Sequence, residues 1–405
     1  MHDLDYDPLD PSTLEDPFPV YERLRAHCPV HHFAGFTPPF FTLTRYDDVL
    51  AGLRDWETWS IRYGSNPHYM RPAGLFNDPP EHTWFRNLFN RGFTPRTVGH
   101  LEREIEQLAH ELLEGVITDG HGDFHDFYAA RLPATIIARL IGVPAVDLGR
   151  FCTMCDDLVA TYNAPDPTAS AAPRAALDAF FQSHIDDRRA ALRAAGIAEP
   201  GVQHLGHVVP NDLLSGFIVA EQDGRRLDDR DLHLMLVLLL LGGLETSTAL
   251  LTNAVWRLLQ VPDRWEQLVA NPDLADIAIE ESLRVDPPVL GLFRTPTRNV
   301  TLHSVDIPHT SKVMLCFASA NRDAPNGLDH PDEFRLDRDL ARARQHLSFG
   351  FGAHYCAGAH LARLEGRISL RVLAETMPSL RLDGPTERIE PFLLWGRRHL
   401  PVRWA

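Results

Sequence analysis

The segment 349–358 holds the residues with the clearest chemical potential, and its sequence is Phe-Gly-Phe-Gly-Ala-His-Tyr-Cys-Ala-Gly. Cys356 directly precedes a predicted helix, whose N-terminus would stabilise a thiolate. The glycines let the backbone approach a flat ligand closely, and the aromatic rings would keep water from a metal-bound sulfur. The alternatives are a buried structural cysteine and a nucleophile, although no oriented Cys–His pair is visible nearby.

A second group of residues interrupts a long apolar segment, where Gly242 and Gly243 precede Glu245 and Thr246. Two glycines inside a helix cost roughly 1 kcal/mol each relative to alanine, so another requirement must keep them there. They permit either tight helix packing or a local opening of the helix that leaves room for a ligand. The sequence leaves both interpretations open.

The spacing Phe349-x-x-Gly352-x-x-x-Cys356-x-Gly358 resembles the haem-binding loop of the cytochrome P450 family. The resemblance covers nearly the whole chain. It implies a mainly α fold with a small β region, in a single domain over residues 1–405. Haem b (iron protoporphyrin IX) is then expected between the long central helix and the cysteine loop. In the family the cysteine thiolate is the proximal iron ligand and favours O–O cleavage, so the resemblance makes Cys356 the metal ligand.

The resemblance also assigns a catalytic role to the residues after the paired glycines. Glu245 and Thr246 resemble the acid–alcohol pair of the family. This implies that Glu245 relays protons from solvent and that Thr246 donates to bound oxygen, in a groove left where the helix opens.

Glu281-Ser-Leu-Arg284 resembles the Glu-x-x-Arg helix of the family. An isolated pair at this spacing is usually a surface contact of roughly 0.2–0.5 kcal/mol. In the family the pair is buried and joined by a further arginine, which locks the fold around the haem loop. Arg338 is the candidate for this third member, and Arg335 is the less favoured choice.

Haem brings two carboxylates, and burying them requires cationic or hydrogen-bonding partners. The segment 78–86, Asp-Pro-Pro-Glu-His-Thr-Trp-Phe-Arg, resembles the start of the family's helix beside the haem. The positions that match propionate-binding residues of the family are His82, Arg86, Arg294 and His354.

The family fold also indicates which residues face the substrate. The expected lining of the distal pocket is Leu238, Leu241, Gly242, Val289, Leu290, Leu292, Phe392 and Leu393. The loop 59–76, with Tyr63, Tyr69 and Met70, is expected to form its roof. This apolar lining indicates a hydrophobic small molecule, such as a terpenoid, aromatic or steroid-like compound.

The activity implied by the resemblance is a monooxygenase that inserts one oxygen atom from O2 into its substrate. We expect electrons from NAD(P)H through a ferredoxin reductase and a ferredoxin, since no flavin or iron–sulfur segment follows residue 405. A peroxide-driven or ring-coupling haem-thiolate enzyme is an alternative with the same fold, and the Glu245–Thr246 pair argues against a peroxygenase. A non-catalytic haem sensor is the alternative of another class and would need no proton relay.

Periodicity predicts the elements that position these residues. Apolar residues at helical spacing predict helices at 81–91, 96–116, 127–141, 148–162, about 174–194, 228–260, 275–284 and 357–377. The central helix would be roughly 50 Å long. Strands are predicted at 39–45, as a pair within 300–317 and near the C-terminus, whereas 58–80, 164–173 and 321–347 are predicted to be irregular.

Composition narrows the partners and the compartment. The 405 residues include 39 Lys and Arg against 55 Asp and Glu, a net charge of −16, so nucleic acid is not expected as a partner. Five scattered cysteines indicate a reducing, cytoplasmic setting. The N-terminus has no signal-peptide pattern and the longest apolar run, 234–241, is below the ~18 residues of a membrane span. We expect a monomer without membrane attachment.

The acidic charge conflicts with an acidic ferredoxin as partner. The hypothesis that resolves this conflict is a local cationic face near the cysteine loop, which would include Arg91, Arg96, Arg342, Arg344 and Arg363. The alternative is that these arginines pair with neighbouring acids, such as Asp339 and Glu365.

Overall fold

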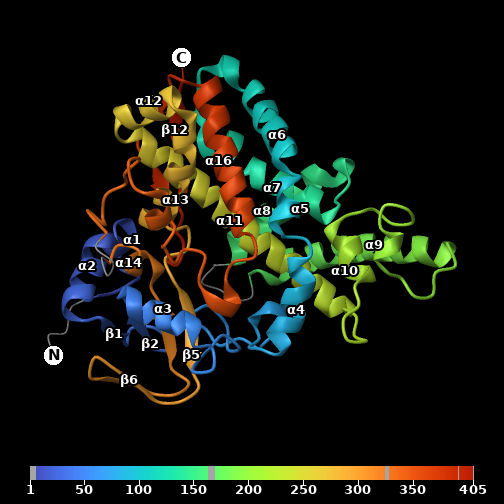
Figure 1. Cartoon of the computed structure of the whole chain (residues 1–405), viewed down its shortest axis with the longest axis horizontal. Helices are drawn as coiled ribbons and strands as arrows, with labels where there is room; N and C mark the ends of the chain where they lie inside the picture. Colours follow the sequence, from blue (N-terminus) through green and yellow to red (C-terminus); the bar gives the residue numbers. More distant parts are fainter. Residues whose placement is uncertain (1–5, 163–168, 324–327, 391, 405) are drawn as a thin grey trace.

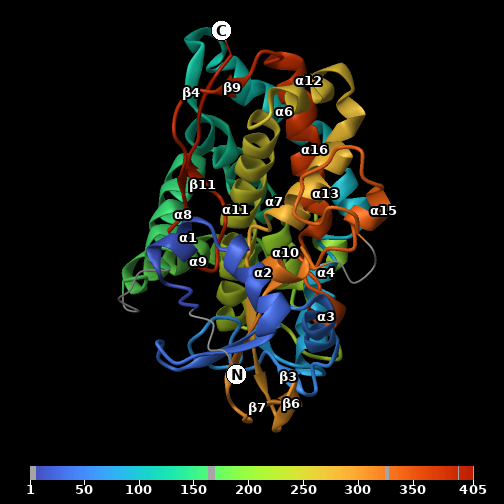
Figure 2. The ribbon, with the colours of Figure 1, turned by 90° about the vertical axis from the view of Figure 1, so that its left-hand side faces the viewer.

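The computed structural model describes residues 6–162, 169–323, 328–390 and 392–404 of the chain. Helices make up most of the molecule, and they surround α11 (Asp229–Leu259), which crosses its centre in both views (Figures 1 and 2). Helices α7 (Arg131–Ile141), α13 (Ala275–Val285) and α16 (Ala359–Thr376) pack directly on α11.

Helix α11 owes its central position to its composition. It starts at Asp228, whose side chain accepts from the Asp231 N–H, and the residues after its first turn are apolar on nearly every face. A helix that is hydrophobic all round belongs in a core or a membrane. By length and composition alone α11 could cross a membrane, but 61% of its most apolar window is buried inside the protein. We therefore interpret it as the core helix.

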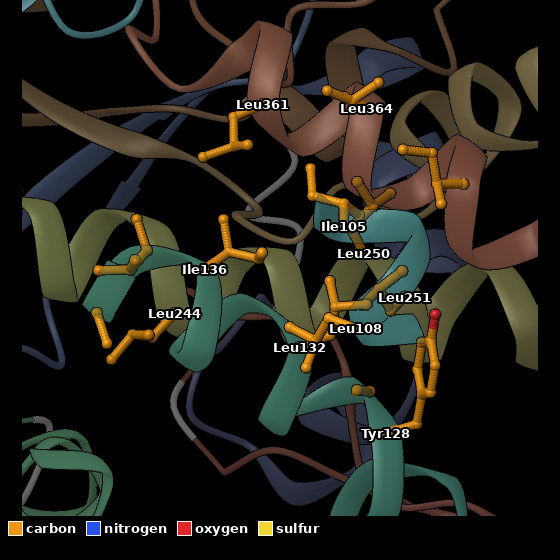
Figure 3. Close-up of a cluster of buried hydrophobic side chains, with 14 of the residues drawn as sticks. Ile105, Leu108, Tyr128, Leu132, Ile136, Leu244, Leu250, Leu251, Leu361 and Leu364 are labelled. Atoms are coloured by element: carbon orange, nitrogen blue, oxygen red, sulfur yellow. The ribbon is translucent and has the colours of Figure 1, made fainter. Parts of the chain in front are cut away.

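The main apolar core forms where α11 meets α6 (Glu102–Glu114), α7 and α16 (Figure 3). Its side chains interdigitate from all four helices, and among them are Ile105, Leu108, Leu132, Ile136, Leu250, Leu251, Leu361 and Leu364. This core fixes α16, and hence the loop before it, relative to α11.

The predicted helices are present, with two of them divided. The segment 96–116 contains α5 (Pro95–Gly99) and α6, and 127–141 contains the π-helix η3 (His125–Ala129) followed by α7. The other predicted helices are α4 (Glu81–Asn90), α8 (Leu148–Tyr162) and α9 (Ala171–Ala194). Residues 164–168 of the predicted connection before α9 lie outside the described residues.

Further short helices lie between these elements. The α-helices are α1 (Pro11–Glu15), α2 (Phe18–His27), α3 (Tyr46–Arg54), α10 (Leu213–Val219), α12 (Pro262–Ala270), α14 (Phe317–Ala320) and α15 (Leu340–Ala343). The 3₁₀ turns are η1 (Gly74–Phe76), η2 (Ile117–Asp119), η4 (Ala145–Asp147), η5 (Val202–His204), η6 (Pro272–Leu274) and η7 (Gly352–His354).

The largest sheet has the strand order β1-β2-β8-β5-β3. Its strands are β1 (Val30–Phe33), β2 (Phe40–Leu43), β8 (Lys312–Leu315), β5 (Leu292–Pro296) and β3 (Trp59–Ser60). Strands β2 and β8 pair in parallel, with Phe40 opposite Lys312, and the other pairs are antiparallel. This sheet joins the N-terminal part of the chain to the segment before the cysteine loop.

Smaller sheets complete the β region. They are the hairpin of β6 (Val300–Leu302) and β7 (Val305–Ile307), the trio of β4 (His121–Asp123), β12 (Pro401–Arg403) and β9 (Arg381–Leu382), and the pair of β10 (Glu387–Arg388) and β11 (Arg397–His399). The segment 300–317 therefore holds three strands where two were predicted.

Candidate functional site

The cysteine loop lies between α3 and α16 and depends on glycine at two positions. Gly350 and Gly352 have φ values of +70° and +71°, which side chains rarely adopt. A Cβ at Gly352 would also lie 3.1 Å from the Leu53 carbonyl oxygen of α3. The Cys356 N–H donates to the Phe349 carbonyl at 2.8 Å and closes the loop. The glycines therefore shape the loop, as their positions in the sequence suggested.

The Cys356 thiol is accessible, although protein atoms crowd around it and α16 begins three residues later. This desolvation raises the pKa of the thiol, and the N–H groups of Gly358 and Ala359 and the cations Arg86 and Arg363 oppose the rise. The surrounding protein alone thus favours the thiol. A metal cation at the sulfur would reverse this preference, because a coordinating thiol is deprotonated outright.

A cluster of charges from α13, α16 and the segment that follows α15 lies beside the loop. We call Glu280, Arg344, His346 and Arg363 the Glu280 cluster, because Arg363 Nε, Arg344 Nε and His346 Nε2 lie 2.7, 3.1 and 3.0 Å from the Glu280 carboxylate oxygens. Burial alone would raise the pKa of Glu280, but hydrogen bonds from His346 and Arg363 outweigh it and hold the pKa at about 2. The cluster is therefore anchored by an ionised acid.

Arg363 links this cluster to the loop itself. Its guanidinium lies 4.6 Å from the centre of the Phe349 ring and donates to the Tyr355 hydroxyl at 3.1 Å. Sequence reasoning missed Glu280, although two adjacent acids on a helix rich in apolar residues were a signal that both are held by partners.

The neighbouring acid, Glu281, is fully buried in a second cluster, the Glu281 triad of Glu281, Arg284 and Arg338. Arg284 Nε and Nη2 donate to the two Glu281 oxygens at 2.6 and 3.0 Å, and Arg338 Nε lies 3.0 Å from Glu281 Oε1. Arg335 contributes only its backbone N–H, at 3.0 Å, while its guanidinium pairs with Asp337. The structure thus brings the Arg338 side chain, rather than that of Arg335, to the acid.

Across from the cysteine loop, α11 is continuous at its paired glycines, so the expected local opening of the helix is wrong for this structure. The Thr246 hydroxyl donates to the Gly242 carbonyl at 2.6 Å within the helix. Gly243 faces α7, where a Cβ would meet Ile137 Cδ1 at 3.1 Å, but a Cβ on Gly242 would meet nothing within 4 Å. The open space therefore lies beside the helix rather than within a break in it, because the helix is continuous here.

Glu245 points to the other side of α11, toward η3 and α8. Burial raises the pKa of its carboxyl, and Asp156 adds to this, whereas His125 opposes it. A raised pKa means that the carboxyl keeps its proton to a higher pH than an exposed glutamate does. Glu245 and Thr246 are thus adjacent in sequence but differ in their surroundings.

Four cationic or hydrogen-bonding groups from three segments gather between β5, α4 and the cysteine loop. The His82 and His354 ring centres are 4.2 Å apart, and the nearby cations Arg86 and Arg294 help to lower the pKa of His354. Burial is the main cause of this shift, which lowers the pKa of His354 to about 2 and that of Arg294 to about 10. We call His82, Arg86, Arg294 and His354 the cation group.

The cation group fits an anionic ligand. His354 Nε2 is buried without a hydrogen-bond partner, and within the described parts of the chain Arg86 makes no hydrogen bond or ion pair to a carboxylate. Asp78, the nearest acid that acts on Arg294, is engaged by the Ser60 hydroxyl at 2.5 Å and the Ile61 N–H. Donors that are buried without acids suit the two carboxylates of haem.

The residues expected around the pocket are divided by the structure. Those that keep some accessible surface are Leu238, Leu241, Gly242, Val289, Leu292, Phe392 and Leu393. Leu290 is only 4% exposed and lies in the apolar cluster with Phe18, Tyr21 and Trp395, so its assignment to the pocket lining is corrected. The strand-like segment before β5 turns this side chain into the core.

The loop 59–76 lies against α11, as a roof over the pocket requires. A Cβ on Gly74, which has φ +54°, would be 2.8 Å from Leu234 Cδ2 and 3.7 Å from Leu238 Cδ1 of α11. The side chains of Tyr63, Tyr69 and Met70 remain 36%, 51% and 41% exposed.

Comparisons with known proteins agree with this geometry. The family model described as Cytochrome P450 matches residues 162–375. The polyketide biosynthesis cytochrome P450 PksS of Bacillus subtilis is 31% identical over 99% of this chain and 99% of its own. The vitamin D(3) 25-hydroxylase of Pseudonocardia autotrophica is 35% identical over 96% of this chain and 94% of its own.

Solved structures are similar over the same range. PksS superposes with a TM-score of 0.86 at 30% identity, covering 99% of this chain and 100% of that chain. CYP109E1 from Bacillus megaterium in complex with testosterone gives a TM-score of 0.83 at 28% identity, covering 96% of this chain and 99% of that chain.

Proposed function

This chain belongs to the cytochrome P450 family and is a haem-dependent oxidoreductase that incorporates oxygen from O2, and we propose that it hydroxylates a hydrophobic molecule of steroid or polyketide size. The observation that carries this substrate class is the open space beside Gly242, with Leu238 and Leu241 on the same helix. The names of the relatives support it, since one is a vitamin D(3) hydroxylase and another is bound to testosterone.

In this proposal the residues between α11 and the cysteine loop would hold the haem, which would supply the activation of O2. Cys356 Sγ would ligate the iron, and the cation group would bind the propionates. The positive-φ turn at Gly350 and Gly352 keeps the backbone flat against the ligand, and Phe349 and Gly358 border the sulfur. The Glu281 triad acts on this loop as a structural support.

Thr246 and Glu245 control protons on the distal side. The Thr246 hydroxyl donates to the Gly242 carbonyl beside the open space. It would turn from this carbonyl to give its proton to a ligand in that space, and Glu245, on the side of η3 and α8, would return a proton to the threonine oxygen. The haem sensor has no use for such a pair, so the catalytic function is preferred.

Two measurements test this function. The reduced carbon monoxide complex should show the red-shifted Soret band of thiolate ligation, and Cys356→His should lose the band and all oxygen insertion.

In Thr246→Ala, NADH consumption should persist while product falls by roughly tenfold or more and hydrogen peroxide rises. Thr246→Ser keeps the hydroxyl and is the matched control. Unchanged product per NADH in Thr246→Ala would contradict the proton role.

The substrate class is tested separately, by spin-state titration with testosterone, corticosterone and vitamin D3. A shift of the Soret band from low to high spin with at least one of them is expected. If small aromatic compounds shift the spin state and none of these three does, the proposed size class is wrong.

The finer proposal for electron delivery is a ferredoxin, with its NAD(P)H-dependent reductase, in the cytoplasm. The five cysteines are free thiols, which supports a reducing compartment. Arg344 and Arg363 each pair with an acid, as the alternative to a docking face expects, but that acid is Glu280 rather than Asp339 or Glu365. Arg342 follows Asp339 in α15, where the acid accepts its N–H, and the side chain of Arg96 lies outside the described residues.

Arg91 is the exposed cation that tests this docking without disturbing the Glu280 cluster. Arg91→Glu should lower the rate of first-electron transfer several-fold at low salt and reduce its dependence on ionic strength. Arg398→Glu, on β11, is the control. If neither salt nor Arg91→Glu changes the rate, docking is not electrostatic.

A further inference from the structure

The chain contains one lysine, Lys312, and it is fully buried at the start of β8. Its Nζ donates to the carbonyl oxygens of Tyr63 and Gly64 at 2.8 and 3.1 Å. The same ammonium lies 5.1 Å from the centre of the Tyr69 ring. All of these contacts are to the loop 59–76. None of the roles assigned above explains why a buried lysine binds this loop.

The segment begins in β3, which pairs with β5, and two more hydrogen bonds hold its later residues to β5 and to the turn before β8. The Phe293 N–H of β5 donates to the Ser65 carbonyl at 2.9 Å, and the Tyr69 hydroxyl donates to the Thr310 carbonyl at 2.6 Å. At its far end the loop contacts Leu234 and Leu238 of α11 through Gly74. The loop therefore bridges the sheet and the helix beside the open space at Gly242.

Lys312 is an expensive group to bury, because no carboxylate in the described residues pairs with it. The charged or titratable groups that face it are Arg294 from β5 and Tyr63 and Tyr69 from the loop, while β2 places the uncharged Phe40 opposite it. Burial, followed by the charge of Arg294, lowers the pKa of Lys312 to about 8. The two loop carbonyls are thus its main compensation for lost hydration.

We propose that Lys312 is a positioning residue that holds the loop 59–76 closed over the pocket, and that release of its two hydrogen bonds opens the loop to admit bulky substrates. This proposal depends on the proposed function in one respect only, namely that the molecule admitted beneath the loop is the substrate. Opening hydrates the ammonium, whereas closing restores both carbonyl contacts. A ligand under the loop stabilises the closed form.

A single lysine lets amine acylation report the opening directly. The holoenzyme is treated with sulfosuccinimidyl acetate, and acetylation of Lys312 is followed by mass spectrometry against the α-amine of the expressed chain, whose pKa is also ~8. We expect slow acetylation of Lys312, about tenfold faster in Tyr69→Phe, which loses the bond to Thr310. Saturating 4-phenylimidazole, a bulky haem ligand, should slow it several-fold. Equal rates in all three samples, or no acetylation in any, would overturn the proposal.

Substitution of Lys312 tests its effect on access. Lys312→Met keeps the length of the apolar stem without the donors, and Lys312→Arg keeps the donors and the charge. In Lys312→Met we expect binding of 4-phenylimidazole to become about tenfold faster. Binding of the small ligand imidazole and the carbon monoxide spectrum should stay unchanged. Trypsin should also cleave faster after Arg62, which precedes Tyr63 in the loop, and Lys312→Arg should resemble the parent.

A purely structural role predicts a different pattern. Lys312→Met would then lower haem content and change both imidazole ligands equally, and this result would overturn the proposal. If Lys312→Met does not fold, the acetylation rates in Tyr69→Phe decide. Loss of the thiolate spectrum in the parent protein would contradict the proposed function but would leave the acetylation results interpretable.

Discussion

Buried charges are compensated differently on the two sides of the cysteine loop. Below the loop, the Glu280 cluster and the Glu281 triad place each acid among several cations at hydrogen-bonding distance. Above it, Arg294 and Lys312 are buried and donate to backbone carbonyls, and Asp78 is the acid that acts on Arg294. Arginine and histidine occur on both sides.

This difference separates charges that maintain the fold from charges that serve something else. A buried charge with a protein partner is compensated in the folded chain itself. A buried cation without an acid costs free energy until an anion or a moving segment compensates it. Substitutions on the two sides should therefore change stability in opposite directions.

The largest expected effect is on the side where each buried acid has cations as partners. Glu281→Gln leaves Arg284 and Arg338 buried without their acid, and breaking such a pair costs about 3–5 kcal/mol. We expect a marked fall in the thermal midpoint and in haem content, read by calorimetry and by the absorbance ratio of haem to protein. Glu102→Gln, which removes an exposed pair with Arg367, should cost less than ~1 kcal/mol. Similar losses in the two variants would remove the distinction between the sides.

The next largest effect is expected on the side where buried cations have no acid as partner. It has opposite signs for the stability of the haem-free protein and for haem retention. Arg294→Met removes a buried cation, so the haem-free protein should be as stable as the parent or more stable in urea. The same change should weaken haem retention about 10- to 100-fold, since hydrogen bonds to charged groups contribute about 1.5–3 kcal/mol. Transfer of haem to apomyoglobin measures this loss, with the exposed Arg298→Met as control. A fall in the stability of the haem-free protein would place Arg294 with the structural charges.

The smallest expected effect concerns Glu365, an acid that does not follow the pattern of Glu280 and Glu281. Glu365 of α16 is buried, and burial raises its pKa to about 8, although the neighbouring Ser247 opposes this rise. The folded protein then binds a proton that the unfolded chain releases, so stability is full below pH ~4.3 and falls as pH rises toward 8. The slope is at most about 1.4 kcal/mol per pH unit.

Glu365→Gln removes this titration, so its stability relative to the parent should increase between pH 5 and pH 8. Urea unfolding at several pH values measures the change, and Glu375→Gln at the end of the same helix is the control. A difference that does not depend on pH would contradict the raised pKa of Glu365.

Much of this site could be predicted from local sequence. The cysteine loop depends on glycines within ten residues of Cys356, and the Glu281–Arg284 contact spans one helical turn, so both are visible as spacing. The helices around them follow apolar periodicity. Even Arg338, 57 positions from Glu281, was found because its segment was known from the resemblance.

Features that depend on distant segments could not be predicted. Lys312 meets the loop 59–76 only because β8 pairs with β2 and β5, which no local pattern reveals. Leu290 is apolar like its neighbours, and only the fold decides that it faces the core. The continuity of α11 at Gly242 is visible only in the folded chain, because the sequence allowed an opening of the helix equally well.

The parallel pairing of β2 with β8 also has a consequence for biosynthesis. The edge of β2 has no partner on that side until residue 315 leaves the ribosome, and at 5–20 residues per second this takes roughly 15–50 s after β2 is made. During that interval the hydrophobic strand Phe40–Leu43 is a nascent edge that chaperones or other chains can bind. Slower synthesis prolongs this exposure, whereas helices such as α6 and α7 can form from nearby residues as they appear.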